Sequence, residues 1–434
     1  MAEAGARAAT ILLVDVNAMF ASCAALADPT LAGTPLVVAI DPADRRSIVL
    51  TASYEARACG VRTAMPLGQA LALCPDLKVA APDHQLYRQS QQAMGKVLRR
   101  YTPLVEWVSI DEAFLDLTGC PILGQGPLAA AGEIREVVRT ELGLPVSIGI
   151  SSTRFLAKMA SPLAKQAASG VCLLPLERVP EHLYPLPIEA FHGIGPKTAG
   201  RLRAFSITTI GDLARASSRK LAQLIGQLGS TFQAELRGEG PRGVEPGETE
   251  AKSISHELTF ARDIADPDQL RPVLLALSDQ VAARLRRAGL AGRQVTLTVR
   301  DTSFATHSRQ LTAEQPLFLT EEIFPKVLTL LGRIPASALP CRLAGVGVGG
   351  LQPMAPLPDT LFAGRRQTRQ ALAGALDQIR QRYGDDALLW ASTLGSPGQE
   401  LYDARQHGSS FRTRELPSEP KRTKPRPPRP AKSR

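Results

Sequence analysis

The stretch LVEWVSIDEAFLDL, residues 104–117, decides the fold because it sets two adjacent acids between two apolar runs. The first run predicts a strand, Asp111-Glu112 a tight turn, and the second run another strand. Neighbouring residues on a strand point to opposite faces, so a turn is what lets both carboxylates point the same way. The stretch therefore predicts a hairpin with an acidic pair at its bend.

A third acid ends another apolar run, in ILLVDV at residues 11–16, where Asp15 follows four aliphatic residues. A folded sheet could bring Asp15 to Asp111 and Glu112, and adjacent carboxylates repel unless a cation or a raised pKa relieves them. Oxygen-only ligands suit Mg²⁺ or Mn²⁺ better than zinc. The three acids therefore predict a site for two Mg²⁺ ions, with a turn residue and a hairpin corner as the plain alternative.

Four segments occur in the order and spacing of the Y-family, or translesion, DNA polymerases, and the resemblance is strongest to the polymerase IV (DinB) branch. They are DVNAMFASC (15–23), TASYEARACGVRTAMPLGQA (51–70), YTPLVEWVSIDEAFLDLTG (101–119) and SIGISSTRFLAKMASPLAK (147–165). Four long motifs in register are far more specific than one short pattern. The resemblance implies a multidomain α/β (α+β) fold, the right-hand polymerase with palm, fingers, helical thumb and α/β little finger.

The resemblance also implies a role for each matching residue. Asp15, Asp111 and Glu112 match the catalytic, metal-binding acids, and the backbone carbonyl of Val16 matches a further ligand. The side chains that match those holding the incoming triphosphate are Tyr54, Arg57 and Lys165. Arg and Lys suit this role because they neutralise phosphate charge.

Phe20 matches the steric gate, a bulky side chain that would collide with a ribose 2′-hydroxyl and so select deoxynucleotides. Taken alone, Phe20 could be a plain core residue and Tyr54 plain packing. Two positions depart from the polymerase IV pattern: Asn17 stands where a second Asp is usual, and Met19 replaces the usual aromatic residue beside the gate. A thioether deforms more easily than a ring, so the tightness of sugar selection stays open.

The matching segments and the linker signals between them predict the domain organisation. The palm is split in sequence by the fingers, and Gly- and charge-rich residues before Lys252 mark a linker. We expect the palm at 1–31 and 74–175, the fingers at 32–73, the thumb at 176–247, the little finger at 252–351, a C-terminal extension at 352–410 and a disordered basic tail at 411–434.

Apolar spacing predicts several elements within these domains. A helix over residues 87–100 can lie on the palm sheet, and a helix over 153–165 sets Lys158 and Lys165 seven residues apart on one face. Lys158 stays open between a solvated and a DNA-facing charge. Alternation over residues 294–300 predicts a half-buried strand, with residues 253–256 and 341–343 in neighbouring or edge strands and a further helix over 366–383.

Several residues match contacts with primer-template DNA. In the thumb, Gly193 and Gly195 precede a helix that carries Lys197, an arrangement that resembles a helix-hairpin-helix and lets backbone N–H groups approach a phosphate. On the little finger, Arg300 and Arg342 are candidate phosphate contacts, although a plain solvated face explains either one nearly as well.

Two features lie near the C-terminal end. Leu361 and Phe362 stand where relatives carry a peptide for the sliding clamp, but the leading Gln is missing, and packing of an apolar pair is the alternative. Residues 411–434 hold nine Lys or Arg against two Glu, out of a net charge of +10. This composition predicts a disordered tail that either holds DNA through counterion release or only aids solubility.

Composition agrees with an enzyme of the cytoplasm that acts at the nucleoid. The chain has no run of about 18 apolar residues and no signal-peptide pattern at MAEAGARAAT, so we expect neither a membrane span nor export. Six cysteines without a Cys-x-x-Cys pair argue against zinc and a disulfide framework, and predict reduced, mostly buried thiols. We expect a monomer.

These observations favour an error-prone, template-directed DNA polymerase that adds deoxynucleotides by two-metal phosphoryl transfer in DNA damage tolerance. The predicted domains use the whole chain and leave no segment for 3′ to 5′ proofreading. Two other classes are weighed against it. A non-catalytic DNA-damage scaffold would not need the three acids, and a nucleotide cyclase would not need a primer-template grip.

Overall fold

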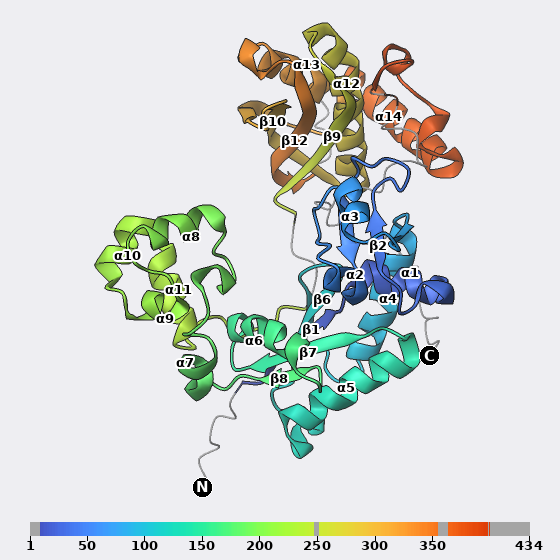
Figure 1. The fold of residues 1–434 in the computed structure, drawn as a ribbon. Helices are drawn as coiled ribbons and strands as arrows, with labels where there is room; N and C mark the ends of the chain where they lie inside the picture. Colours follow the sequence, from blue (N-terminus) through green and yellow to red (C-terminus); the bar gives the residue numbers. More distant parts are fainter. Residues whose placement is uncertain (1–8, 247–250, 355–362, 398, 400–434) are drawn as a thin grey trace, which may run out of the picture. The chain divides into compact units, whose positions relative to one another are not determined.

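The computed structural model describes residues 9–246, 251–354, 363–397 and 399. The chain divides into two compact units, Met1–Glu248 and Thr249–Arg434. Figure 1 shows the first unit in blue to green and the second in yellow to red. Within the described ranges, no helix combines the length and apolar content that crossing a membrane requires.

A five-stranded sheet forms the centre of the first unit, in the order β5-β6-β1-β7-β8. The pairs are antiparallel except β7–β8, which is parallel. The predicted hairpin is confirmed: β5 and β6 pair across a turn at residues 108–111. The strands are β1 Ile11–Val16, β5 Val105–Trp107, β6 Glu112–Asp116, β7 Val146–Ser151 and β8 Val171–Leu173.

The two faces of this sheet pack against different helices. Leu12, Val14 and Val16 of β1 join one core with α1 (Met19–Ala27), α4 (His84–Leu98) and α5 (Pro127–Leu142), whereas Ile11 and Leu13 face Ala157 of α6 (Arg154–Gln166). Asp15 follows Leu13 by two residues and so lies on the α6 face. Figure 1 shows α5 and α6 on opposite sides of the strands.

Helix α6 approaches the sheet closely because the residue of β7 that lies beneath it, Gly149, has no side chain. A Cβ built on Gly149 would lie 2.3 Å from the carbonyl oxygen of Ala157 and 2.6 Å from the amide nitrogen of Ser161. The predicted helix over 153–165 is confirmed, with the Thr153 side chain capping it by accepting from the Leu156 amide. The close packing fixes the height of the α6 side chains above the strands.

In the sequence, the segment between β1 and β5 of the large sheet forms a small sheet of its own. Its three strands have the order β3-β2-β4. Its elements are β2 Leu36–Ala39, β3 Val49–Ala52, α2 Tyr54–Ala58, α3 Leu67–Leu73 and β4 Lys78–Ala80. β4 pairs with β2, and Cys74 and Leu77 share the core of this sheet. The sheet therefore runs past residue 73, where we expect the fingers to end.

The remainder of the first unit is helical. Its helices share a core that includes Phe191, Leu202, Leu221 and Phe232, which fits the helical domain predicted for residues 176–247. The helices are α7 Val179–His182, α8 Pro196–Arg203, α9 Ile210–Arg215, α10 Ser218–Ile225 and α11 Leu228–Leu236.

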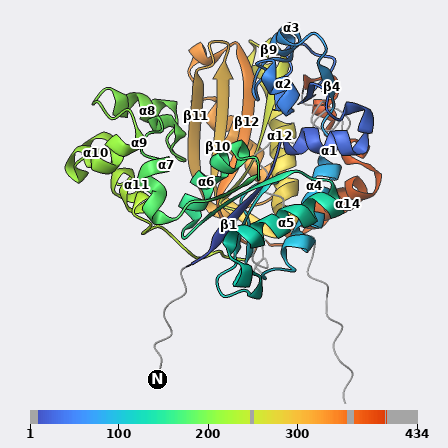
Figure 2. The same cartoon turned by 60° about the horizontal axis from the view of Figure 1, so that its bottom comes forward.

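The second unit has a four-stranded antiparallel sheet, β11-β10-β12-β9, seen side by side in Figure 2. Val295, Leu297 and Val299 are fully buried, which confirms the strand predicted from their alternation. The elements are β9 Ser253–Ile264, α12 Pro267–Arg287, β10 Leu290–Asp301, β11 Thr306–Leu317, α13 Thr320–Leu331 and β12 Cys341–Pro353.

The predicted C-terminal helix is α14, Ala363–Tyr383, and it belongs to the second unit. Arg286 of α12 forms two hydrogen bonds with Asp377, at 2.7 and 2.8 Å. Arg380 of α14 pairs with Asp279 at 2.8 Å, and both side chains are nearly inaccessible to solvent. These ion pairs fix α14 to α12.

All six cysteines are free thiols. Cys23, Cys74 and Cys341 are buried and Cys59 is exposed, while the remaining two are partly exposed. Half of the thiols are therefore fully buried, fewer than expected.

Candidate active site

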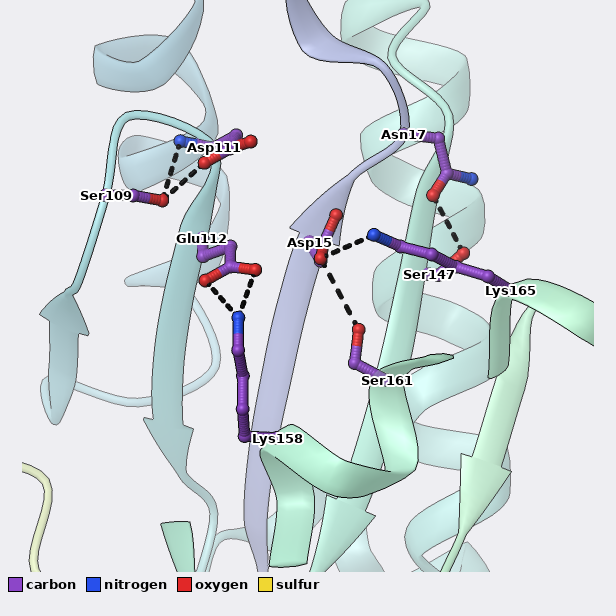
Figure 3. Close-up of polar contacts among 9 residues, drawn as sticks. All are labelled: Asp15, Asn17, Ser109, Asp111, Glu112, Ser147, Lys158, Ser161 and Lys165. Atoms are coloured by element: carbon purple, nitrogen blue, oxygen red, sulfur yellow. Dashed lines mark hydrogen bonds and ion pairs between the residues drawn. The ribbon is translucent and has the colours of Figure 1, made fainter. Parts of the chain in front are cut away.

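Two acids face each other on neighbouring strands. Asp15 of β1 is in register with Glu112 of β6, and both side chains lie on the α6 face of the sheet (Figure 3). Asp15 is only 4% exposed. The Val16 amide donates to the Asp111 carbonyl at 2.9 Å, so the turn that carries the acidic pair is tied to the end of β1.

Asp111 lies apart from the other two carboxylates. The Ser109 hydroxyl donates to the Asp111 carboxylate across the turn (Figure 3). In the part of the chain that the structure describes, no three His, Cys, Asp or Glu side chains are grouped closely enough to hold a metal ion. The turn therefore directs Glu112 at Asp15, but not Asp111, because the local Ser109 contact holds that side chain.

Helix α6 places three polar side chains over the two strands. Lys165 Nζ donates to Asp15 Oδ2 at 2.7 Å, and Ser161 Oγ reaches the same oxygen at 3.4 Å. Lys158 Nζ donates to both carboxylate oxygens of Glu112, at 2.5 Å to Oε2. Figure 3 shows both lysines pointing at the acids. Lys158 thus pairs with Glu112, a contact that neither of the two alternatives left open by the sequence, a solvated or a DNA-facing charge, had named.

Burial and charge act differently on the two acids. Burial is the largest influence on Asp15 and raises its pKa to about 6, against the opposing effect of Lys165. Burial also pushes the pKa of Glu112 upward, but the hydrogen bonds with Lys158 and Asp15 and the charges of both lysines outweigh it and leave that pKa lowered. One buried and one partly buried carboxylate, whose oxygens already contact cationic groups, fit a divalent cation of the Mg²⁺ type.

Phe20 is the second residue of α1, the helix that follows β1 in the chain. Ala18 caps this helix in the left-handed conformation, with φ of 44°. The Phe20 ring stacks on Tyr87 of α4 and is 6% exposed. Met19 is buried in the same core. Asn17 is tied to the sheet, because the Ser147 hydroxyl donates to its side-chain oxygen at 2.9 Å.

Two of the three residues predicted to hold the triphosphate lie together on α2. The Arg57 guanidinium is 5.2 Å from the centre of the Tyr54 ring, and Arg57 Nε donates to the Ala52 carbonyl at 3.0 Å. Tyr54 is 46% exposed, so its ring is not enclosed by the protein and has room for a ligand beside it. The third residue, Lys165, lies with Asp15.

The residues predicted to contact DNA lie in both units. Gly193 has φ of +99° and Gly195 is the N-cap of α8, with Lys197 exposed in the first turn. Arg300 donates to the Thr306 hydroxyl at 3.0 Å, and Arg342 packs over the exposed Phe304 ring at 4.0 Å. Leu361, Phe362 and the tail at 411–434 lie outside the described residues.

Comparison with known proteins matches two segments of the chain to one family. Residues 14–162 match the impB/mucB/samB family, and residues 251–361 match that family's C-terminal domain. A DNA polymerase IV of Pelotomaculum thermopropionicum is 36% identical over 401 residues, which cover 92% of this chain and 99% of that protein. A DNA polymerase IV of Clostridium kluyveri is 36% identical over 396 residues, covering 88% and 98%.

A solved structure has a similar fold. It is a Y-family DNA polymerase chimera of Dbh and Dpo4, which aligns with a TM-score of 0.67 and 21% identity. The alignment covers 78% of this chain and 98% of the chimera. This likeness confirms the mixed helix-and-sheet fold expected from the sequence.

Proposed function

The chain belongs to the impB/mucB/samB family of Y-family DNA polymerases, on the polymerase IV branch, and we infer that it extends a DNA primer with deoxynucleotides along a template. Enzymes of this kind bind DNA, act in translesion synthesis and use divalent metal ions. The observation that carries the assignment is the pair formed by the buried Asp15 and the partly buried Glu112, in register on neighbouring strands and faced by two lysines.

We propose that the site holds two Mg²⁺ ions, with Mn²⁺ as a substitute. Asp15 and Glu112 would bind them, together with the Val16 carbonyl and with Asp111 once its side chain leaves Ser109. Bound there, the ions would lower the pKa of the primer 3′-hydroxyl and neutralise charge on the leaving pyrophosphate. The chain's own residues would place the reactants for this transfer.

The residues around the acids would position the nucleotide. Tyr54 and Arg57 would hold the triphosphate from α2, where they already lie side by side, and Lys165 would join them from α6. The Phe20 ring would exclude a ribose 2′-hydroxyl. Tyr54, Arg57 and Lys165 would act as hydrogen-bond donors to the phosphate oxygens, and Phe20 would act by its bulk, so none of the four has to give up or take a proton.

Residues outside the acidic site would bind the primer-template DNA. Backbone amides at Gly193 and Gly195, with Lys197, Arg300 and Arg342, would contact phosphates. We further propose low-fidelity synthesis without proofreading, action as a monomer at the nucleoid in the cytoplasm, and docking of Leu361 and Phe362 to the sliding clamp. The tail at 411–434 would add salt-dependent DNA affinity.

The test is extension of a labelled primer on an undamaged template with Mg²⁺ and deoxynucleotides. We expect the wild type to extend it and Asp111→Ala and Glu112→Ala each to abolish extension. Asp116→Ala is the matched control, because Asp116 is on the same strand β6 but at its far end, and it should retain activity. A wild type that binds DNA tightly yet never extends a primer would point to a scaffold instead.

A further inference from the structure

Lys158 engages Glu112 more completely than any other contact in the site engages an acid. Its ammonium contacts both carboxylate oxygens, whereas Lys165 contacts one oxygen of Asp15. The Lys158 and Glu112 side chains are 23% and 17% exposed. A partly buried pair of this kind is held more strongly than a surface pair, because solvent screens its attraction less.

The backbone sets this contact. Lys158, Ser161 and Lys165 are spaced by three and four residues, so they share the face of α6 that looks onto β1 and β6. Gly149 lets α6 lie against the sheet, as its missing Cβ would overlap the helix backbone. The Lys158 stem therefore cannot move away from Glu112 with the helix, and only a side-chain rotation separates the two charged groups.

The lone pairs that Lys158 occupies are the ones through which Glu112 would bind a cation. An ammonium across both oxygens and a divalent cation on the same oxygens exclude each other sterically and by charge. We propose that Lys158 is a positioning residue for Glu112, which holds the carboxylate toward Asp15 before a divalent cation binds and competes with that cation for it. This inference rests on the proposed polymerase function.

The competition predicts opposite effects of two substitutions on metal affinity. Lys158→Met keeps the length of the side chain and removes its charge, so Mn²⁺ should bind about tenfold more tightly or better, since the competing ion pair is partly buried. Lys158→Arg keeps the charge and can grip a carboxylate with two parallel hydrogen bonds, so Mn²⁺ should bind more weakly than to the wild type.

The measurement is a titration of the full-length protein with Mn²⁺, without DNA or nucleotide, in which electron paramagnetic resonance reports free Mn²⁺. Each variant is also melted thermally to show that it is folded. Because Lys158→Arg retains the ion pair, it keeps the test valid if Lys158→Met does not fold. The same Lys158→Met change is then made in a Glu112→Gln background.

The Glu112→Gln background distinguishes competition between Lys158 and the cation for Glu112 from a general repulsion of the cation by the Lys158 charge. If Lys158 acts through Glu112, the gain in affinity disappears in Glu112→Gln. An equal gain in both backgrounds, or an unchanged or weakened affinity in Lys158→Met, would overturn the inference. Failure of the metal site itself has a different signature, in which neither Asp15→Asn nor Glu112→Gln alters Mn²⁺ binding.

Discussion

The ring of Phe20 lies parallel to the ring of Tyr87, with the centroids 4.0 Å apart and the planes within 10° of each other. Tyr87 comes from α4 and is 1% exposed. Its hydroxyl is buried and, among the described residues, has no hydrogen-bond partner. The proposed steric gate therefore rests on a second aromatic ring, which limits how far it can move.

This stacking predicts how sugar selection responds to substitution. Phe20→Ala should raise the efficiency of ribonucleotide relative to deoxynucleotide insertion by at least about tenfold, because the space above C2′ opens. Tyr87→Leu should raise it by less, since Phe20 stays but loses its support. The measurement is kcat/KM for both nucleotides. Tyr87→Phe is the control: it keeps the ring and removes only the unpaired hydroxyl, so its ratio should match the wild type.

The close packing of α6 predicts a cost for adding one carbon beneath it. Gly149→Ala should lower the free energy of unfolding by about 1–3 kcal/mol through overpacking, and weaken extension by lifting Lys158 and Lys165. Gly132→Ala on α5 is the matched control, because its Cβ meets nothing within 4 Å and a helical alanine is favoured. Urea unfolding should show opposite signs for the two.

The N-terminus of α9 predicts a pH-dependent contribution to stability. Asp212 accepts hydrogen bonds from the Thr208 and Thr209 amides, which hold its pKa far below the ordinary value of 3.8. A lowered folded-state pKa stabilises at pH values above the unfolded pKa, and this contribution is lost as the pH falls. Asp212→Asn should lower the stability at pH 7, because a neutral amide replaces the carboxylate of the capping box. In urea unfolding, a cost that does not shrink below about pH 4 would contradict this.

The buried pair between α12 and α14 predicts a large effect at a site remote from the acids. Arg380→Leu should destabilise the second unit by about 3–5 kcal/mol, because Asp279 stays buried without its countercharge. Adding Asp279→Leu should restore part of the loss. Arg382→Leu, an exposed arginine on the same helix, should change the melting temperature little. Equal effects of Arg380→Leu and Arg382→Leu would refute the prediction.

The proposed phosphate contact of Arg342 predicts a change in salt dependence. Arg342→Ala should lower the slope of log affinity for primer-template DNA against log salt by about 1. Lys326→Ala removes an exposed charge from α13, for which no phosphate contact is proposed, and should leave the slope unchanged. Fluorescence anisotropy at several salt concentrations would show whether the two substitutions differ.

Local pattern predicted much of the fold. The alternation of Val295, Leu297 and Val299 and the capped helix after Thr153 needed no information from distant residues. The helix predicted from residue 87 begins at His84, because the Asp83 side chain accepts from the Leu86 amide and caps it earlier. Propensity and capping act over a few residues, so the sequence displays them directly.

Contacts between strands that are distant in the sequence could not be predicted from local patterns. Lys158 has the spacing of a helix-surface residue, and only the pairing of β1 with β6 shows that Glu112 lies beneath it. The side chain of Asp111 depends on Ser109, a neighbour whose hydroxyl could equally have faced solvent. The parallel pairing of β4 with β2 likewise has no local signal.

Lys165 and Asp15 share a hydrogen bond although 150 positions separate them in the chain. A ribosome that adds roughly 5–20 residues per second needs about 10–30 s to reach Lys165. Throughout that time the nascent polypeptide contains first Asp15 and then Glu112, but not yet the lysine that pairs with Asp15. Truncated products of interrupted translation that stop before α6 therefore lack both lysines that face Asp15 and Glu112.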